Sequence, residues 1–387
     1  MVGVFKKHHY LSEKLSTGVI LLYTNRLIQQ TADSLLGLFF PIFLYQKYGS
    51  INAVLIFFLI SYLLGFLLAA PGAMISSRIN FRRALIISVF GGTLYYLALY
   101  FFDQSLVLFS GLAILAINFD CMLYWVPYHS DFANFTNRKN RGRTIAYLAS
   151  VASLIAIVVP VFSGFVITKY GFEVIFLMVI VVYLSSVIPF FFLPPISEQY
   201  SFTYRETFKY LFHPRDRKIL LSYMAEGIDS IIGLAVWPIF IWEILKGNYE
   251  AMGIISSSVV LFTVVIRLIV GKYTDKFDRK KMIKFGSVLY SLGWIAKIFV
   301  QTGFQIFITS TYHNFAAVAM KTPFDALTYD KASDSGRFVD EFTVLREMAL
   351  ALGRVVGLIL ALVLFNFFNI NYSFFLAALA ALLVNIL

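Results

Sequence analysis

The sequence predicts an all-α polytopic membrane protein, with twelve transmembrane helices arranged as two related six-helix bundles. Three observations lead to this fold class. The 387 residues are 59% hydrophobic and 14% charged, whereas roughly a quarter of the residues in a soluble domain are charged. Apolar runs long enough to cross a membrane recur along the whole chain. Several groups of residues also repeat at one constant spacing.

The predicted spans are separated by short connections that contain charged or turn-forming residues. Each span is taken to end where its apolar run meets such residues. The spans are expected at 17–46, 51–75, 82–102, 104–129, 142–168 and 172–193, and then at 218–245, 250–274, 282–301, 304–329, 341–367 and 371–387. They define an N-terminal bundle (1–193), a linker (194–217) and a C-terminal bundle (218–387).

The positions of the basic residues predict the orientation of the chain. Of the 32 lysine and arginine residues, Lys47, Lys169 and Lys246 are the ones that fall in loops on the side opposite the N-terminus. Because loops on the cytoplasmic side are enriched in Lys and Arg, we expect both termini there, in the inner membrane of a prokaryotic cell. The net charge of +11 then reflects topology and contact with the anionic lipid bilayer, and no nucleic-acid partner is expected.

The linker is basic and has one short amphipathic stretch. Tyr204, Phe208, Leu211 and Phe212 fall on one face of a possible helix. This pattern is compatible with a helix in the headgroup plane and equally with a plain solvated connection.

An internal repeat relates the two bundles at an offset of 196 residues. Asp33-Ser34 in the first span recurs as Asp229-Ser230 in the seventh. At the same offset, Asn118 and Pro127 recur as Asn314 and Pro323, and Arg141 recurs as Arg337. The repeat predicts two halves that run in the same direction and are related by an axis along the membrane normal.

Ionisable side chains within the spans are the candidate functional residues, because an unpaired charge in hydrocarbon is costly. Asp33 and Asp229 are the first candidates for proton coupling, and Glu226 and Asp120 are the second. Asp33 and Asp229 are expected to face each other near the middle of the membrane. The residues expected to line a central solute site are Arg26, Gln29, Gln30, Asn118, Trp125, Trp237, Asn314, Lys321, Asp325 and Arg354.

Structural roles remain open for the charged candidates. The two repeated aspartates could simply hold helices together. Glu226 could pair with Lys321 or Arg26, and Lys321 could instead pair with Asp325 one turn away. Arg354 could neutralise an acid of the seventh span or bind an anionic solute.

Other polar and aromatic residues have simpler interpretations. His129 and His313 could relay protons, but packing between helices is favoured. Trp125 and Trp237 could stack on a solute, although packing is again favoured. Lys297 is expected to snorkel to the outer membrane surface without a role at the solute site.

The loop between the eighth and ninth spans carries the most specific motif. It reads Gly271-Lys-Tyr-Thr-Asp275-Lys276-Phe-Asp278-Arg279-Lys280 and matches the loop motif G-x-x-x-D-[RK]-x-[GD]-R-[RK] of the major facilitator superfamily. With twelve spans in two parallel halves, the chain resembles this family over nearly its whole length. The resemblance implies a secondary transporter that works by alternating access. It also implies a gating loop made of Gly271, Asp275, Lys276, Arg279, Lys280, Arg141 and Arg143.

Two other segments depart from the patterns of the family. In the loop between the second and third spans, Ser76 stands where an acidic residue is expected. The antiporter signature of the fifth span is approximated only by Pro160, Ser163 and Gly164, which disfavours a drug antiporter.

We therefore expect a proton-coupled permease for a small solute, acting as a monomer without a cofactor. An uncoupled facilitator, a drug or metabolite efflux carrier, and a non-transporting receptor or assembly subunit are the alternatives. The sequence has no P-loop, nucleophile-elbow or zinc-protease motif, and Cys121 is its single cysteine. These absences predict that the chain is not an enzyme.

Asp275→Asn tests the predicted gating loop. By resemblance, Asp275 should bind the start of the fifth span near Arg141 and Arg143 and stabilise the outward-open state. The substitution should therefore shift the population toward the inward-open state, as measured by the access of probes from each face. Unchanged access from both faces would reject this role.

Overall fold

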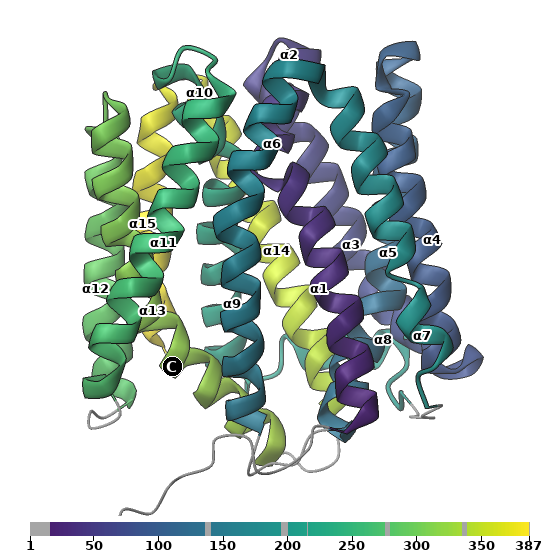
Figure 1. Cartoon of the computed structure of the whole chain (residues 1–387). Coiled ribbons are helices and arrows are strands. Elements are labelled where there is room, and N and C mark those ends of the chain that lie inside the picture. The colour runs from purple at the N-terminus through teal and green to yellow at the C-terminus, as the bar shows by residue number, and fades with distance from the viewer. Residues whose placement is uncertain are drawn as a thin grey trace, which may run out of the picture.

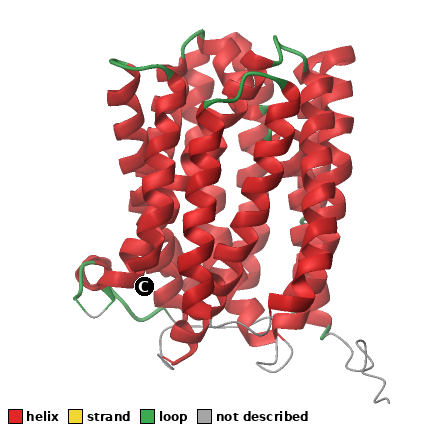
Figure 2. Cartoon of the chain, turned by 90° about the vertical axis from the view of Figure 1, so that its left-hand side faces the viewer, coloured by secondary structure: helices red, strands yellow, loops and turns green. Residues whose placement is uncertain are grey.

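The computed structural model describes residues 16–135, 141–194, 200–214, 216–274, 279–334 and 339–386, and these residues form helices and connections without a strand. Figures 1 and 2 show the helices side by side along one direction, with their connections at the two ends of the molecule. The predicted all-α class is thus confirmed for the described residues.

The N-terminal half begins with a broken helix and ends with a sharply bent one. It consists of α1 (Thr17–Gly37), α2 (Phe40–Tyr48), α3 (Ile51–Ile79), α4 (Phe81–Tyr100), α5 (Leu106–Phe135), α6 (Arg141–Ser185) and α7 (Ile188–Phe191). Two predicted spans lie within α6, because its backbone leaves helical geometry at Gly171, where φ is 80°. Glycine adopts this φ without a Cβ clash, and Figure 1 shows the chain turning there and returning toward α7.

The C-terminal half follows a short linker helix and contains one broken helix of special interest. Its elements are α8 (Tyr204–Leu211) in the linker, α9 (Arg217–Ile231), the π-helical turn η2 (Ile232–Val236), α10 (Trp237–Ile244), α11 (Tyr249–Thr274), α12 (Arg279–Ile298), α13 (Gly303–Asp334), α14 (Val339–Phe365) and α15 (Ser373–Leu383). The seventh predicted span is therefore α9, η2 and α10 in succession.

Eight helical segments of the described residues are long and apolar enough to cross a membrane. One of them, 150–191, contains the break at Gly171 and so holds two predicted spans. The segments of α12, α13 and α15 are not among the eight, because polar residues dilute the first two and the third is short. The count of twelve spans and the cytoplasmic termini therefore remain proposals.

Helix packing follows the same pattern in the two halves. In the first half α4 and α3 both pack on α5, and in the second α12 and α11 both pack on α13. Between the halves, α3 packs on α14 and α6 packs on α11. The repeat offset of 196 residues exchanges these last two contacts, so the packing has the pseudo-twofold character that the sequence repeat predicts.

The contact between α6 and α11 brings two backbones close together. A Cβ added at Gly253 of α11 would meet the carbonyl oxygen of Pro160, and one added at Gly164 of α6 would meet the carbonyl oxygen of Tyr249. Small residues allow such close approach of helices in membranes. The two halves therefore approach each other closely at these glycines, and the rings of Phe172 and Tyr249 also pack there, 5.7 Å apart.

The linker helix α8 contacts both halves. A capping box formed by Thr203 and Glu206 starts the helix, and the Thr203 donors hold the pKa of Glu206 below its usual value. Phe208 packs edge-on against Phe66 of α3, with ring centroids 5.6 Å apart. Just before α8, the backbone N–H of Ser201 donates to Glu341 Oε1 of α14 at 2.9 Å. The alternative of a plain solvated connection is therefore wrong.

Gly253→Ala tests the close contact between α6 and α11. The added methyl group must push the two backbones apart, and overpacking of this kind destabilises proteins by about 1–3 kcal/mol. We expect a lower thermal unfolding midpoint in detergent. Gly111→Ala is the matched control, because a Cβ at Gly111 meets nothing within 4 Å and should be neutral or slightly stabilising. Equal midpoints for both variants would contradict the close contact.

Candidate functional site

The first polar cluster surrounds Asp33 in the middle of α1. Arg26 Nη1 lies 3.5 Å from Asp33 Oδ2, and the Tyr96 hydroxyl of α4 donates to Asp33 Oδ1 at 2.9 Å. The Arg26 guanidinium lies 5.1 Å from the ring centroid of Trp125 on α5. Nevertheless, 46% of the Asp33 side chain is exposed. Asp33 is thus an oriented carboxylate that solvent or a solute can still reach.

Asp120 continues this cluster into the N-terminal half. It is 5% exposed, and the Tyr183 hydroxyl of α6 donates to its Oδ2 at 2.8 Å. The rings of Tyr96 and Tyr183 are 5.3 Å apart. Two neighbouring tyrosines therefore join the open carboxylate Asp33 to the buried carboxylate Asp120.

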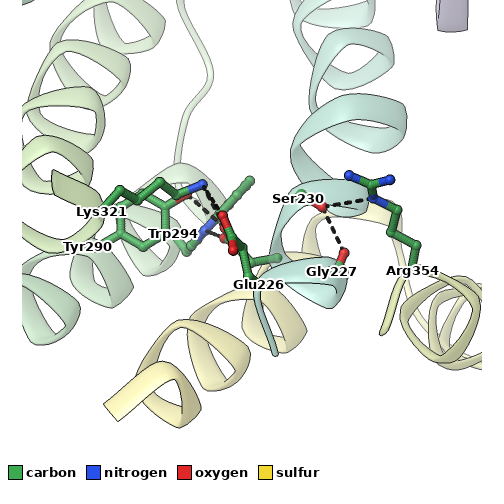
Figure 3. A network of polar contacts seen from close by, with 8 residues as sticks. Glu226, Gly227, Ser230, Tyr290, Trp294, Lys321 and Arg354 are labelled. Atoms are coloured by element: carbon green, nitrogen blue, oxygen red, sulfur yellow. Dashed lines mark hydrogen bonds and ion pairs between the residues drawn. The ribbon is translucent and has the colours of Figure 1, made fainter. Parts of the chain in front are cut away.

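The second polar cluster surrounds Asp229 at the end of α9. Trp294 Nε1 donates to Asp229 Oδ1 at 2.5 Å, and the Tyr290 hydroxyl donates to Oδ2 at 3.0 Å. Lys321 Nζ lies 3.8 Å from Asp229 Oδ2 and 3.9 Å from Glu226 Oε1, and Figure 3 shows Lys321 beside Glu226, Tyr290 and Trp294. The predicted pairing of Glu226 with Lys321 is thus formed. Asp229 itself is 2% exposed, so it is closed off from solutes.

The two repeated aspartates have equivalent partners but do not meet. Each accepts hydrogen bonds from the third predicted span of its own half, which is α4 for Asp33 and α12 for Asp229. The described contacts do not join the two carboxylates. The expectation that they face each other across the molecular axis therefore has no contact to support it.

Arg354 lies between the two halves without an acidic partner among the described side chains. Its Nε donates to Ser230 Oγ at 3.4 Å, and its guanidinium lies 4.8 Å from the ring centroid of Tyr62 on α3. Figure 3 shows Arg354 beside Ser230, apart from the group formed by Lys321 and Glu226. One alternative required Arg354 to neutralise Glu226 or Asp229, and the structure shows no such ion pair among the described side chains.

The remaining predicted residues have varied surroundings. Gln29 is 1% exposed and faces the bundle, so the polar stripe of α1 is not open along its whole length. Asn118 is 5% exposed and donates to Ile114 O and Ser61 Oγ. Gln30 and Asn314 are half-buried. Asn118 therefore has a packing role within the N-terminal half.

Most of the predicted gating loop cannot be placed. Asp275 and Lys276 lie outside the described residues. The same applies to the side chains of Arg141, Arg143, Arg279, Lys280 and Asp325, and Gly271 is known only as part of the α11 backbone. A hollow of about 600 Å³ at the turn between α3 and α4 is lined by Arg78, Arg82 and Arg83 among others, but by none of the predicted site residues.

The prediction that Lys297 snorkels to the membrane surface is wrong. Lys297 is 3% exposed, and its Nζ lies 3.9 Å from the ring centroid of Trp294 and 4.5 Å from that of Trp237. The ammonium group points into the bundle because two indole faces stabilise it there. His313 also packs there, with its ring 4.1 Å from that of Tyr290, in keeping with the favoured packing role.

Sequence reasoning missed the aromatic residues that organise both clusters. These are Tyr96 and Tyr183 in the first half and Tyr290 and Trp294 in the second. One signal was available in the sequence, because Tyr290, Trp294 and Lys297 share a helical face. With 41 Phe and 23 Tyr in the chain, such aromatic patterns are too common to be noticed.

Comparisons with known proteins agree on the fold. The sequence model of the Major Facilitator Superfamily matches residues 22–225 and 219–387. The Bacillus subtilis (strain 168) protein named "Uncharacterized protein YqgE" is 25% identical over 252 residues, which are 61% of this chain and 56% of that protein. This chain thus matches little more than half the length of that relative.

Solved structures of transporters have the same fold at low sequence identity. A POT family transporter in complex with 5-aminolevulinic acid has a TM-score of 0.70 and 12% identity, and the match covers 95% of this chain and 94% of that one. A peptide transporter POT in complex with sulfate has a TM-score of 0.69 and 12% identity, with 99% and 97% covered. Since the family model also matches nearly the whole chain, this integral membrane protein belongs to the Major Facilitator Superfamily, whose members are transporters rather than enzymes.

Proposed function

We propose that the protein is a proton-coupled secondary transporter that moves a small solute by alternating access. It acts as a monomer in the inner membrane of a prokaryotic cell, with twelve spans, both termini in the cytoplasm and two bundles that move relative to each other. One observation carries the proposal: the half-exposed Asp33 is joined through Tyr96 and Tyr183 to the buried Asp120.

The charges of the first cluster favour proton exchange. Asp33 and Asp120 are two acids, and among the described side chains Arg26 forms an ion pair with Asp33, whereas Asp120 accepts a hydrogen bond from Tyr183. If both acids were ionised, one negative charge would be left without a partner in apolar surroundings, which is unfavourable. Binding of one proton removes that charge. The exposure of Asp33 gives the proton a route to the pair.

Asp229 and Glu226 are better suited to holding helices together. Asp229 accepts hydrogen bonds from Trp294 and Tyr290 and lies near Lys321, which also pairs with Glu226. Both carboxylate oxygens of Asp229 accept a hydrogen bond, so Asp229 exchanges a proton only if several contacts break. We therefore place proton coupling at Asp33 and Asp120 rather than at Asp33 and Asp229.

The position of Arg354 supports a solute that carries an anionic group. A guanidinium binds carboxylate or phosphate groups through two parallel hydrogen bonds, and the terminal nitrogens of Arg354 have no described acidic partner. Its contact with Tyr62 lies across the α3–α14 interface between the halves. A solute held there would touch both moving parts, as alternating access requires.

Transport into proteoliposomes tests the proposed function. The purified full chain is reconstituted and offered amino acids, peptides, organic acids, sulfate, sugars and lipophilic cations, with and without a gradient of about one pH unit. For one proton per solute, such a gradient supports roughly tenfold accumulation. We expect Asp33→Asn to let the solute equilibrate across the membrane without accumulating.

The control for this experiment is Asp103→Asn, which removes an exposed acid that pairs with Lys47 and should leave accumulation unchanged. Full accumulation by both Asp33→Asn and Asp120→Asn would reject proton coupling. Flux that ignores the pH gradient in the unmodified protein would indicate an uncoupled facilitator. No flux of any solute would favour the non-transporting alternative.

Arg354→Gln tests the proposed solute contact. Loss of a charge-assisted hydrogen bond typically costs about 1.5–3 kcal/mol, so the KM for an anionic substrate should rise tenfold or more. Arg354→Lys, which keeps the charge but not the two-pronged geometry, should give a smaller rise. If both variants keep the KM of the unmodified protein, Arg354 does not bind the solute.

A further inference from the structure

One face of α12 spans the break in the seventh predicted span. Tyr290 and Trp294 on this face bind Asp229, which lies at the end of α9. One turn further along, the Lys297 ammonium lies over Trp237, which begins α10. The π-helical turn η2 separates the two attachment points. This face of α12 therefore contacts both α9 and α10, which lie on either side of η2.

The break itself is a place where the helix can bend. Helices commonly kink at π-helical turns, and such turns are frequent at functional sites. The Trp294 indole packs beside this turn, since a Cβ added at Gly233 within η2 would lie 3.4 Å from it, at ordinary contact distance. Bending at η2 would have to loosen either the Asp229 contacts or the contact of Lys297 with Trp237.

The surroundings of the Lys297 ammonium contain few groups that could balance its charge. The titratable groups whose charges interact with Lys297 are Asp229 from α9 and His313 from α13. From α15, which contains no ionisable residue, Phe374 packs against Trp237 and Trp294. Among the described side chains no carboxylate lies within ion-pair distance of Lys297, and the two indole faces are its close contacts.

We propose that Lys297 is a separate proton-binding site whose protonated form holds α10 against α12. Cation–π attraction requires the ammonium form, whereas burial disfavours that form, so these two effects oppose each other at Lys297. Protonated Lys297 and Lys321 together neutralise Glu226 and Asp229. Loss of the Lys297 proton leaves one negative charge and removes the attraction to Trp237.

Release of α10 would act on the contact between the halves. α10 packs on α2 of the N-terminal half, and there Tyr45 donates to Glu243 Oε1 at 3.1 Å. The rings of Tyr45 and Trp242 are also 6.1 Å apart. The Lys297 proton would therefore stabilise closure of the molecule at the end where α2 and α10 meet. This step rests on the proposed function, because it adds a second proton site to the transport cycle.

Tryptophan fluorescence tests the proton site without any transport. The full chain has four tryptophans, so Trp125→Phe with Trp242→Phe leaves Trp237 and Trp294, the two that face Lys297. Emission from this background is recorded between about pH 5 and pH 10, which covers buried and free lysines. We expect one titration. Lys297→Met and Lys297→Arg should both abolish it, because the first is never charged and the second always is.

The methionine and arginine variants should also differ in how easily a quencher reaches the tryptophans, and general damage to the fold would not produce this difference. In the same background, Lys297→Met should make the combined emission of Trp237 and Trp294 more accessible to a soluble quencher than it is with Lys297 present at low pH. Lys297→Arg should keep this emission protected at all pH values. Lys169→Met is the matched control, because Lys169 lies over the rings of Phe165 and Tyr170 at an exposed position. It should leave the titration unchanged.

Several outcomes would overturn the proposal. A titration that persists in both Lys297 variants and disappears in His313→Asn would assign the proton to the histidine. Equal quenching of the emission from Trp237 and Trp294 in the methionine and arginine variants would show that the charge does not hold α10. These results are independent of proteoliposome transport. The Lys297 site can therefore fail while Asp33 remains the coupling residue, and it can be supported even if transport ignores protons.

Discussion

A charge inside an apolar helix bundle must have a counter-charge or an aromatic face beside it, and the polar geometry of this protein depends on that requirement. Arg26 has Asp33 and Trp125, while Lys321 has Asp229 and Glu226. Lys297 has two indole faces. Trp125, Asp229, Glu226 and Trp237 lie on a different helix from the charge that they face. These charges therefore also determine which helices stay together and which contacts a moving helix would have to break.

The two halves share a sequence repeat, but the repeated aspartates Asp33 and Asp229 have different surroundings. The positions equivalent to Tyr290, Trp294 and Lys297 in the first half are Leu94, Ala98 and Phe101. Without the indole and the lysine, the first half cannot enclose its aspartate, and 46% of the Asp33 side chain is exposed against 2% of Asp229. One half thus has an open carboxylate suited to exchange. The other has a closed one suited to holding helices in place.

The fold could be predicted from the sequence because membrane helices are long, continuous and apolar. Each predicted range overlaps an observed helix or a pair of successive helices, with ends that differ by several residues in places, and the bend at Gly171 falls between two predicted spans. The polar positions of α1 and α9 were also found, since an acid in such a helix stands out. The direction of each side chain was not predictable. Gln29 faces the bundle and Lys297 turns inward because of partners on distant helices, and helical spacing alone does not identify those partners.

The contacts between the halves differ along the molecule in a way that suits movement. At the α6–α11 contact, Gly164 and Gly253 let the two backbones approach closely, and the rings of Phe172 and Tyr249 pack together without a hydrogen bond. At the α2–α10 contact, by contrast, Tyr45 bonds specifically to Glu243. Opening of the molecule at that end must break this bond, whereas the glycine contact can persist through the change. The α2–α10 contact is specific, whereas the α6–α11 contact does not depend on one hydrogen bond. A small change of charge near α10 can therefore alter the balance between the open and closed states.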